Sequence, residues 1–262
     1  MDLKNHDTGD FRLVYLDPAP VAPLLDGQEV AGWFDAEHKV VKKGGKVEAR
    51  LLKTGAGNVF VKHYLTKGLL RRVLAWFGIF RAQRMFRISS SLQEIGVRVP
   101  QPMAYLAERR RDCSSSYFIC EALDAEDLKL VAVTRGLDAI GGAAWVFSEV
   151  TNMLACLHSE GYAHGDTKWA NWMVARDGPR LVLIDLDGVR KPVWRRSKRF
   201  GRDLARFLIN ARELKIDERE VEAMLAKYAR LRGLSVAQVL RDLGPAYSKL
   251  AKRHRKKYGS QL

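Results

Sequence analysis

The sequence predicts an α+β protein of two lobes, a small antiparallel sheet in the N-terminal lobe and mainly helices in the C-terminal lobe. Three short strand-like runs separated by turns fill residues 38–64. Residues 144–160 carry apolar side chains at helical spacing, and beyond Asp203 the pattern is helical to the end. Strands that come first and helices that come later are typical of segregated α+β proteins.

The expected elements follow one another with clear turn signals. Double-glycine and glycine-containing turns separate the first strands, and Gly161 stands where the cap of the clearest helix belongs. In chain order we expect strands at 38–41, 47–52 and 59–64, one or two helices over 69–93, strands at 103–107 and 116–120, a helix at 144–160, and strands at 172–175 and 181–184.

These elements place the lobe boundary near the middle of the chain. We expect an N-terminal lobe over 1–122, irregular over 1–38 because of its prolines, and a C-terminal lobe over 123–262. The start of the chain lacks a signal-peptide pattern, the longest apolar run is too short to span a bilayer, and the three cysteines form no metal or redox pair. We therefore expect a cytoplasmic protein, soluble or peripheral to a membrane.

Charge is the most unusual bulk property of the chain. The formal net charge is +15, and the excess is concentrated. Residues 49–93 contain nine Lys and Arg and no acid, and residues 189–202 contain seven and no acid. Such fields attract polyanions: phosphorylated substrates, anionic headgroups or nucleic acid. The basic cluster at 252–257 fits a solvated tail equally well.

The residues that carry chemistry follow the helix at 144–160. Phosphoryl transfer to a hydroxyl needs a proton acceptor, oxygen ligands for Mg²⁺ and cations for the phosphates. Asp166 would accept the proton, and Lys168 would neutralise the γ-phosphate. Asn171 would bind Mg²⁺ together with Asp185, which ends an apolar strand fourteen residues later. These residues stand in the order that a kinase requires and predict a protein-kinase-like fold.

The spacing of His164, Asp166 and Asn171 makes this signal strong. The alternative interpretation is that these residues form only a polar turn after a helix. The aspartate at the end of the downstream strand argues against this alternative. Asp187, two residues beyond that aspartate, would assist through water or hold the turn.

The N-terminal lobe offers candidates for nucleotide binding. Lys62 is the one lysine in an apolar strand and would pair the α- and β-phosphates, although such a lysine is often simply solvent-facing. Gly44 and Gly45 would cover the phosphates, a weak signal because glycine pairs also mark plain hairpins. Backbone groups of Glu121 and Leu123, at the end of a strand, would contact adenine.

Together, several segments resemble the bacterial lipopolysaccharide core kinases of the Kdo/WaaP type over roughly residues 45–230. The segments are the strand lysine and residues 118–123, 157–166, 183–187 and 202–207. The resemblance implies ATP as donor and a heptose or Kdo hydroxyl of the inner core as acceptor, at the cytoplasmic face of the inner membrane. It also implies that Asp203 is a structural aspartate that anchors the catalytic turn.

One feature departs from the kinase pattern. Kinases usually place a glutamate in the helix after the lysine strand, paired with that lysine. Here the stretch from the lysine strand to the expected helix contains no acid before Glu94, which lies in the last turn of that helix. Met85 lies near the usual position of the glutamate. Either Glu94 serves, or Lys62 is held otherwise, or the site is degraded.

The acceptor is less well determined than the reaction. The segment 185–203 is short and lacks an Ala-Pro-Glu signature, which favours a small or glycolipid acceptor over a peptide. The basic, aromatic stretch 67–81 would suit a membrane interface, and an ordinary packed helix explains it equally well. The alternatives are a kinase of another small molecule or of a protein, and a non-catalytic kinase-like protein that binds nucleic acid, which lacks a supporting signature.

Overall fold

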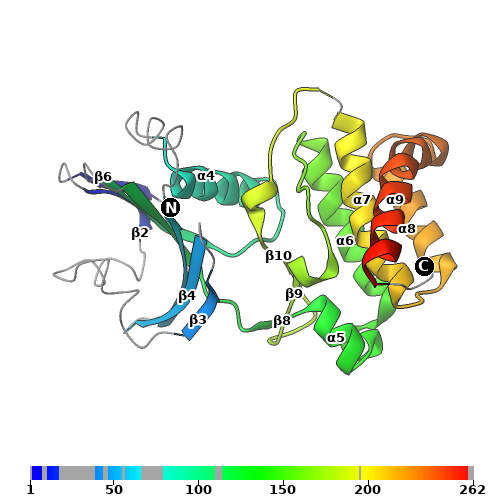
Figure 1. The fold of residues 1–262 in the computed structure, drawn as a ribbon, viewed down its shortest axis with the longest axis horizontal. Coiled ribbons are helices and arrows are strands. Elements are labelled where there is room, and N and C mark those ends of the chain that lie inside the picture. The colour runs from blue at the N-terminus through cyan, green and yellow to red at the C-terminus, as the bar shows by residue number, and fades with distance from the viewer. Residues whose placement is uncertain are drawn as a thin grey trace. The chain divides into compact units, whose positions relative to one another are not determined.

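The computed structural model describes residues 2–7, 11–17, 39–43, 47–54, 57–65, 79–109, 114–194 and 196–258. The chain divides into two compact units, one formed by Met1–Ser91 with Pro100–Leu123 and the other by Leu92–Val99 with Asp124–Leu262. Strands dominate the first unit and helices the second (Figure 1). The predicted α+β fold of protein-kinase-like type is confirmed.

The first unit is built on a seven-stranded antiparallel sheet in the order β1-β2-β6-β7-β5-β4-β3. Side chains from five of its strands form one buried apolar cluster that includes Leu52, Val61, Leu106 and Ile119. The strands are β1 Asp2–Asp7, β2 Phe11–Asp17, β3 Lys39–Lys43, β4 Val47–Thr54, β5 Gly57–Leu65, β6 Pro102–Arg109 and β7 Ser114–Glu121.

The expectation that residues 1–38 are irregular is wrong for β1 and β2. These strands pair with each other, and β2 also pairs with β6. The first proline of the chain is Pro18, so nothing in residues 2–17 prevents strand pairing. Leu13 and Val14 are both buried, which gives β2 a place in the packed sheet.

Helix α4, Arg81–Glu94, forms the C-terminal part of the stretch that was expected to be helical. Ala82, Met85, Phe86, Ser89 and Leu92 are buried, and their spacing of three and four residues marks one face of the helix. The other charged and polar side chains of the helix lie on the remaining faces. Residues 66–78, which contain most of the basic, aromatic stretch, lie outside the described residues.

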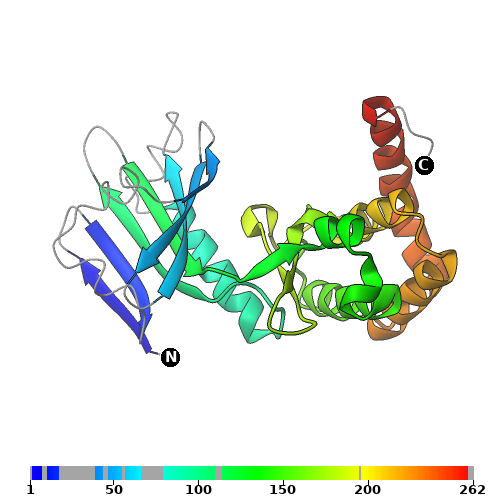
Figure 2. The same ribbon diagram turned by 90° about the horizontal axis from the view of Figure 1, so that it is seen from below.

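The second unit combines helices with a three-stranded sheet in the order β10-β9-β8. In Figure 2 the colours of its helices run from green for the earlier ones to red for the last. The elements are β8 Ala125–Asp127, α5 Leu128–Thr134, α6 Gly142–Ser159, β9 Trp172–Ala175, β10 Leu181–Leu183, α7 Arg196–Glu213, α8 Glu218–Leu231 and α9 Val236–Tyr258. Among the described residues, none of the helices is long and apolar enough to cross a membrane.

Aromatic side chains fill the core of the second unit next to residues 164–171, the predicted catalytic loop. Trp169 stacks on Phe207 at a centroid distance of 5.4 Å, and Phe147 meets Phe207 edge-on at 5.2 Å. Trp169 and Trp172 are fully buried, and their indole N–H groups donate to the carbonyl oxygens of Phe207 and Thr167, each at 3.1 Å. This packing fixes the short helical turn that carries Asn171.

Candidate active site

The predicted catalytic loop, residues 164–171, follows shortly after the end of α6. Gly161 adopts a positive φ of 78°, which stops the helix and turns the chain. Ala163 then forms an antiparallel bridge with Arg190, through N–H···O bonds of 2.8 and 3.0 Å. This bridge holds the beginning of the loop against the segment that follows Asp185.

Asp203 of α7 anchors the loop through hydrogen bonds to its backbone. Its side chain is completely buried and accepts hydrogen bonds from the backbone N–H groups of His164 and Gly165, both at 2.7 Å. The hydroxyl of Thr167 donates to the backbone carbonyl of Asp203. Hydrogen bonds to an ionised carboxylate are about twice as strong as neutral ones, so this one residue fixes the path of three loop residues.

A second histidine supports Asp203 from α6. His158 is fully buried, with Nε2 3.3 Å from Asp203 Oδ2 and Nδ1 2.7 Å from the hydroxyl of Tyr228. Because a carboxylate can only accept, Nε2 carries the proton, and the Tyr228 hydroxyl donates to Nδ1. Burial lowers the pKa of His158, and the neighbouring Asp203 only partly opposes this. The ring is therefore neutral, as a structural histidine.

His164 connects the loop to the strand-ending aspartate. Its Nδ1 accepts from the backbone N–H of Asp166 at 3.2 Å, so its Nε2 carries a proton and donates to the carbonyl of Ile184 at 3.1 Å. Burial lowers the pKa of His164, which favours this neutral form. The imidazole therefore sets the backbone of Asp166 on one side and that of Asp185 on the other.

The carboxylate of Asp166 lies between two cations. Lys168 Nζ is 3.4 Å from Oδ2, and Nη1 of Arg206 is 3.1 Å from Oδ1. Arg206 was not among the expected site residues. The signal was present, because Arg206 follows Asp203 by three residues and shares its face of α7.

Asn171 is held with its amide nitrogen turned inward. Nδ2 donates to the backbone carbonyl of Asp166 at 2.7 Å, and the Asn171 carbonyl accepts from the N–H of Ile184 at 2.9 Å. The first bond fixes the orientation of the amide and leaves Oδ1 as the atom able to bind a cation. The second bond places Asn171 beside the strand end that carries Asp185.

Asp185 has a strained backbone, with φ 59° and ψ 55°. Within the described ranges, Lys215 is the only other residue besides glycine with a positive φ. Such conformations cost about 1–3 kcal/mol and concentrate at functional sites. The turn that follows packs closely on the loop, because a Cβ added to Gly188 would lie 2.7 Å from the carbonyl oxygen of His164.

These contacts bring Asp166, Lys168, Asn171 and the backbone of Asp185 into one region of the second unit. Over the described residues, no group of three or more His, Cys, Asp and Glu could hold a metal ion. A cation here would rely on Asn171 Oδ1 and the Asp185 carboxylate, with its remaining ligands from a phosphate donor and water. Mg²⁺ accepts such an incomplete protein shell.

The expected nucleotide-binding residues lie in the first unit. Lys62 is half-buried in β5, opposite Phe118 of β7. Burial raises the pKa of the Cys120 thiol to about 12, with the charge of Lys62 opposing the shift. The N–H of Glu121 donates to the Gln101 carbonyl at 2.9 Å, so this N–H is already engaged within the first unit.

The other residues expected near the nucleotide lie at the edge of the first unit, in α4 or outside the described residues. Leu123 is the last residue of the first unit. Gly44 and Gly45 lie outside the described residues. Met85, near the usual position of the helix glutamate, is buried with 1% of its surface exposed, whereas Glu94 is exposed at the end of α4.

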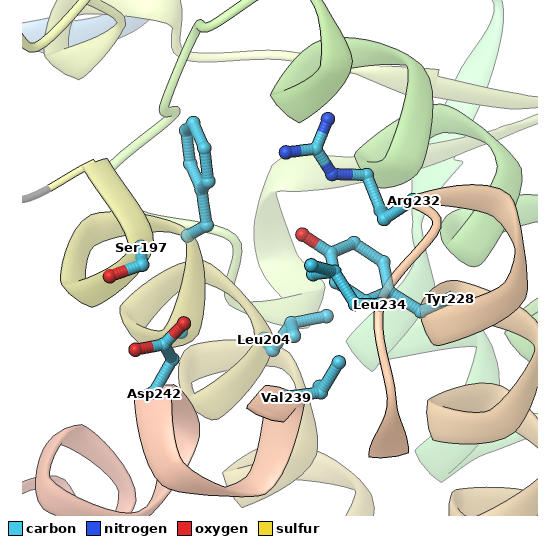
Figure 3. Close-up of a pocket in the computed structure, with 9 residues that line it drawn as sticks. Ser197, Leu204, Tyr228, Arg232, Leu234, Val239 and Asp242 are labelled. Carbon is cyan, nitrogen blue, oxygen red and sulfur yellow. The ribbon is translucent and has the colours of Figure 1, made fainter. Parts of the chain in front are cut away.

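A separate pocket of about 270 Å³ lies in the second unit between α7, α8 and α9 (Figure 3). No residue of the catalytic loop lines it. Two of its lining residues nevertheless contact His158: Tyr228 through its hydroxyl, and Phe200 by stacking at 4.3 Å. The pocket therefore borders the support of the loop, not the loop itself. The lining residues are Ser197, Phe200, Gly201, Leu204, Tyr228, Arg232, Leu234, Val239 and Asp242.

A buried aspartate that holds a loop bearing Asp, Lys and Asn, beside an aspartate at a strand end, is the arrangement of protein-kinase-like phosphotransferases. The chain matches the family model described as the lipopolysaccharide kinase (Kdo/WaaP) family over residues 32–228, and it belongs to this family. The protein is therefore a kinase, a phosphotransferase with an alcohol group as acceptor. No curated protein sequence matches the chain significantly.

Proposed function

We propose that the protein transfers the γ-phosphoryl group of ATP to a sugar hydroxyl, of heptose or Kdo, in the inner core of lipopolysaccharide. The single observation that carries the proposal is the convergence at the catalytic loop. Asn171 donates to the backbone of Asp166 and accepts from the residue before Asp185. Family membership supports the acceptor class.

Asp166 is proposed to accept the proton of the attacking hydroxyl. Its carboxylate already lies against Lys168 and Arg206, which fix its orientation. The Lys168 side chain is long and nearly half exposed, so it can leave Asp166 and neutralise the γ-phosphate once a nucleotide is bound. Arg206 would remain as the positioning partner of Asp166.

Asn171 and Asp185 are proposed to hold Mg²⁺, which would neutralise the charge of the transferring phosphate when bound. Lys62 is proposed to contact the α- and β-phosphates, Gly44 and Gly45 to cover them, and the backbone at Glu121 and Leu123 to contact adenine. The high positive charge of the chain supports a phosphorylated, anionic acceptor.

We further propose that the protein works in the cytoplasm at the surface of the inner membrane, where such an acceptor is displayed. Lipopolysaccharide core, or another anionic glycolipid, is the proposed partner. Nucleic acid is not expected as a ligand. Strong RNA binding without ATP turnover would support the non-catalytic alternative instead.

The proposal is tested with purified protein, ATP, Mg²⁺ and de-acylated core oligosaccharide, with the product weighed by mass spectrometry. The wild type should add one phosphate. Asp166→Ala should lose about 10²–10⁴-fold in turnover and retain ATP binding, because a general base contributes about that much. Asp185→Ala should lose Mg²⁺-dependent ATP binding. Asp177→Ala, in the exposed turn between β9 and β10, is the control.

A deletion strain provides the complementary measurement. Its core oligosaccharide should lack one phosphate relative to the parent strain. An unchanged core mass would eliminate this acceptor, and an acceptor that is phosphorylated equally by the Asp166→Ala protein would eliminate the proposed proton acceptor.

A further inference from the structure

Val193 and Trp194 present an exposed apolar pair close to the catalytic loop. Their exposed fractions are 76% and 82%, the largest of the exposed large hydrophobic residues in the described part of the chain. A tryptophan side chain this exposed contributes little apolar burial to the stability of the fold. Adjacent exposed apolar side chains often mark a contact surface.

The backbone that carries this pair is anchored on its N-terminal side. Arg190 pairs with Ala163, and the ammonium of Lys191 lies 4.3 Å from the centre of the Tyr162 ring. Pro192, directly before Val193, is buried. The apolar pair therefore projects from a fixed point next to the loop.

The segment that carries the pair is rich in cations. Residues 189–202 contain seven Lys and Arg and no acid. Arg190, Lys198 and Arg202 are exposed in the structure. Exposed tryptophan beside several cations is the composition that binds an anionic bilayer, with the indole at the headgroup level and the cations on the phosphates.

We propose that Val193, Trp194 and the cations Arg190, Lys198 and Arg202 form a docking surface for an anionic phospholipid membrane. We call this set the 190–202 surface. The proposal rests on the proposed function, because a kinase whose acceptor is a membrane glycolipid must bring its catalytic loop to that membrane. Charge complementarity identifies the occupant: the segment 189–202 carries seven cations and no acid, and the headgroups are anionic.

A matched patch elsewhere provides the control. Val133 on α5 is also exposed, at 63%, and lies in a segment that contains acids nearby in sequence, Glu126 and Asp127. Lys249 on α9 is an exposed lysine outside the 190–202 surface. The pairs Val193→Ser with Val133→Ser and Lys198→Gln with Lys249→Gln change the same chemistry at two places.

The test is flotation of the full chain with vesicles of phosphatidylcholine alone or mixed with phosphatidylglycerol, without ATP. The wild type should float with the mixed vesicles and release as salt rises. Val193→Ser combined with Trp194→Ala should bind about tenfold or more weakly, from the lost apolar burial. Lys198→Gln should lose about fivefold, the share of one cation, and both control variants should match the wild type.

Three outcomes would overturn the docking surface: vesicle affinity of the double variant equal to that of the wild type, a loss in Val133→Ser equal to that in its matched variant Val193→Ser, or binding that does not need phosphatidylglycerol. A matching urea-unfolding curve for the double variant shows that it is folded. The proposed function is judged separately, by phosphorylation of soluble core oligosaccharide by the wild type. Wild-type protein that floats but does not phosphorylate would refute the function and leave the surface standing.

Discussion

Asp203→Asn tests the central structural inference, that one buried carboxylate holds the catalytic loop. The carboxylate accepts from His164 N–H and Gly165 N–H at 2.7 Å each, and from His158 at 3.3 Å. Asparagine has nearly the same shape but one accepting oxygen. If that oxygen takes the position of Oδ2, the side-chain NH₂ group of asparagine takes the position of Oδ1. This NH₂ group then faces the Gly165 N–H, and because both groups are donors no hydrogen bond forms.

The expected cost follows from these bonds. A hydrogen bond to a charged group contributes about 1.5–3 kcal/mol, and a buried donor left without a partner costs about 1–3 kcal/mol. Asparagine weakens the bonds that remain and leaves one backbone N–H unpaired. The neutral amide avoids the desolvation of a fully buried carboxylate, which offsets part of the loss. We therefore expect a destabilisation of about 3 kcal/mol.

Urea unfolding followed by tryptophan fluorescence measures this change, because Trp169 and Trp172 lie in the core of the second unit. Turnover should fall by about 10²-fold even in the folded fraction, since a displacement of the loop by about 1 Å has effects of that size. Asp177→Asn, on the surface, should change the unfolding free energy by less than about 0.5 kcal/mol. If Asp203→Asn proves as stable and as active as that control, the loop does not depend on its buried carboxylate.

Three further predictions follow from close contacts and burial. Gly201→Ala should destabilise the protein by about 1–3 kcal/mol, because the new Cβ would lie 2.2 Å from a backbone carbonyl oxygen of α9. Gly244→Ala, where the new Cβ has open space, should stabilise the protein by up to about 1 kcal/mol. Urea midpoints of the two variants that shift in the same direction would contradict this pair of predictions. Burial lowers the pKa of His63 to about 4, so the unfolded chain, with a His pKa of about 6.5, binds more protons, and stability should fall between about pH 6.5 and 4. His63→Phe should remove about 1–2 kcal/mol of that acid decline in unfolding curves measured at both pH values, and an unchanged decline would refute the assignment. Arg206→Gln should lower kcat about tenfold with the KM for ATP unchanged, because the ion pair of the guanidinium within the described residues is with Asp166, at 3.1 Å. A change in KM alone would mean that Arg206 binds nucleotide.

The proximity of the candidate catalytic residues was predictable because they lie at short sequence spacings. Asp166, Lys168 and Asn171 lie within six residues, so local backbone geometry alone keeps them together. The partners that hold them were harder to find. Tyr228 reaches the loop only through His158 and Asp203, and its hydrogen bond spans seventy residues of chain. No local pattern encodes a contact of that range.

The fold was predictable where apolar periodicity decides it and less so near the N-terminus. The strand pattern of β4 and β5 and the helical pattern of α6 contain buried side chains at regular spacing. By contrast, β1 carries polar and charged side chains and lies at the edge of the sheet, where one neighbouring strand is enough to order it. Pairing of that kind depends on backbone hydrogen bonds, which amino-acid composition does not reveal.

The contacts within the second unit suggest how the proposed chemistry is divided between the two units. The loop is held by α6 through His158, by α7 through Asp203 and Arg206, and by the strand end through Ile184. These four supports, among the described residues, all belong to the second unit. Under the proposed function, Lys62 of the first unit would add contacts to the nucleotide phosphates. The printed contacts that hold the loop therefore do not depend on which residue, Glu94 or another, pairs with Lys62.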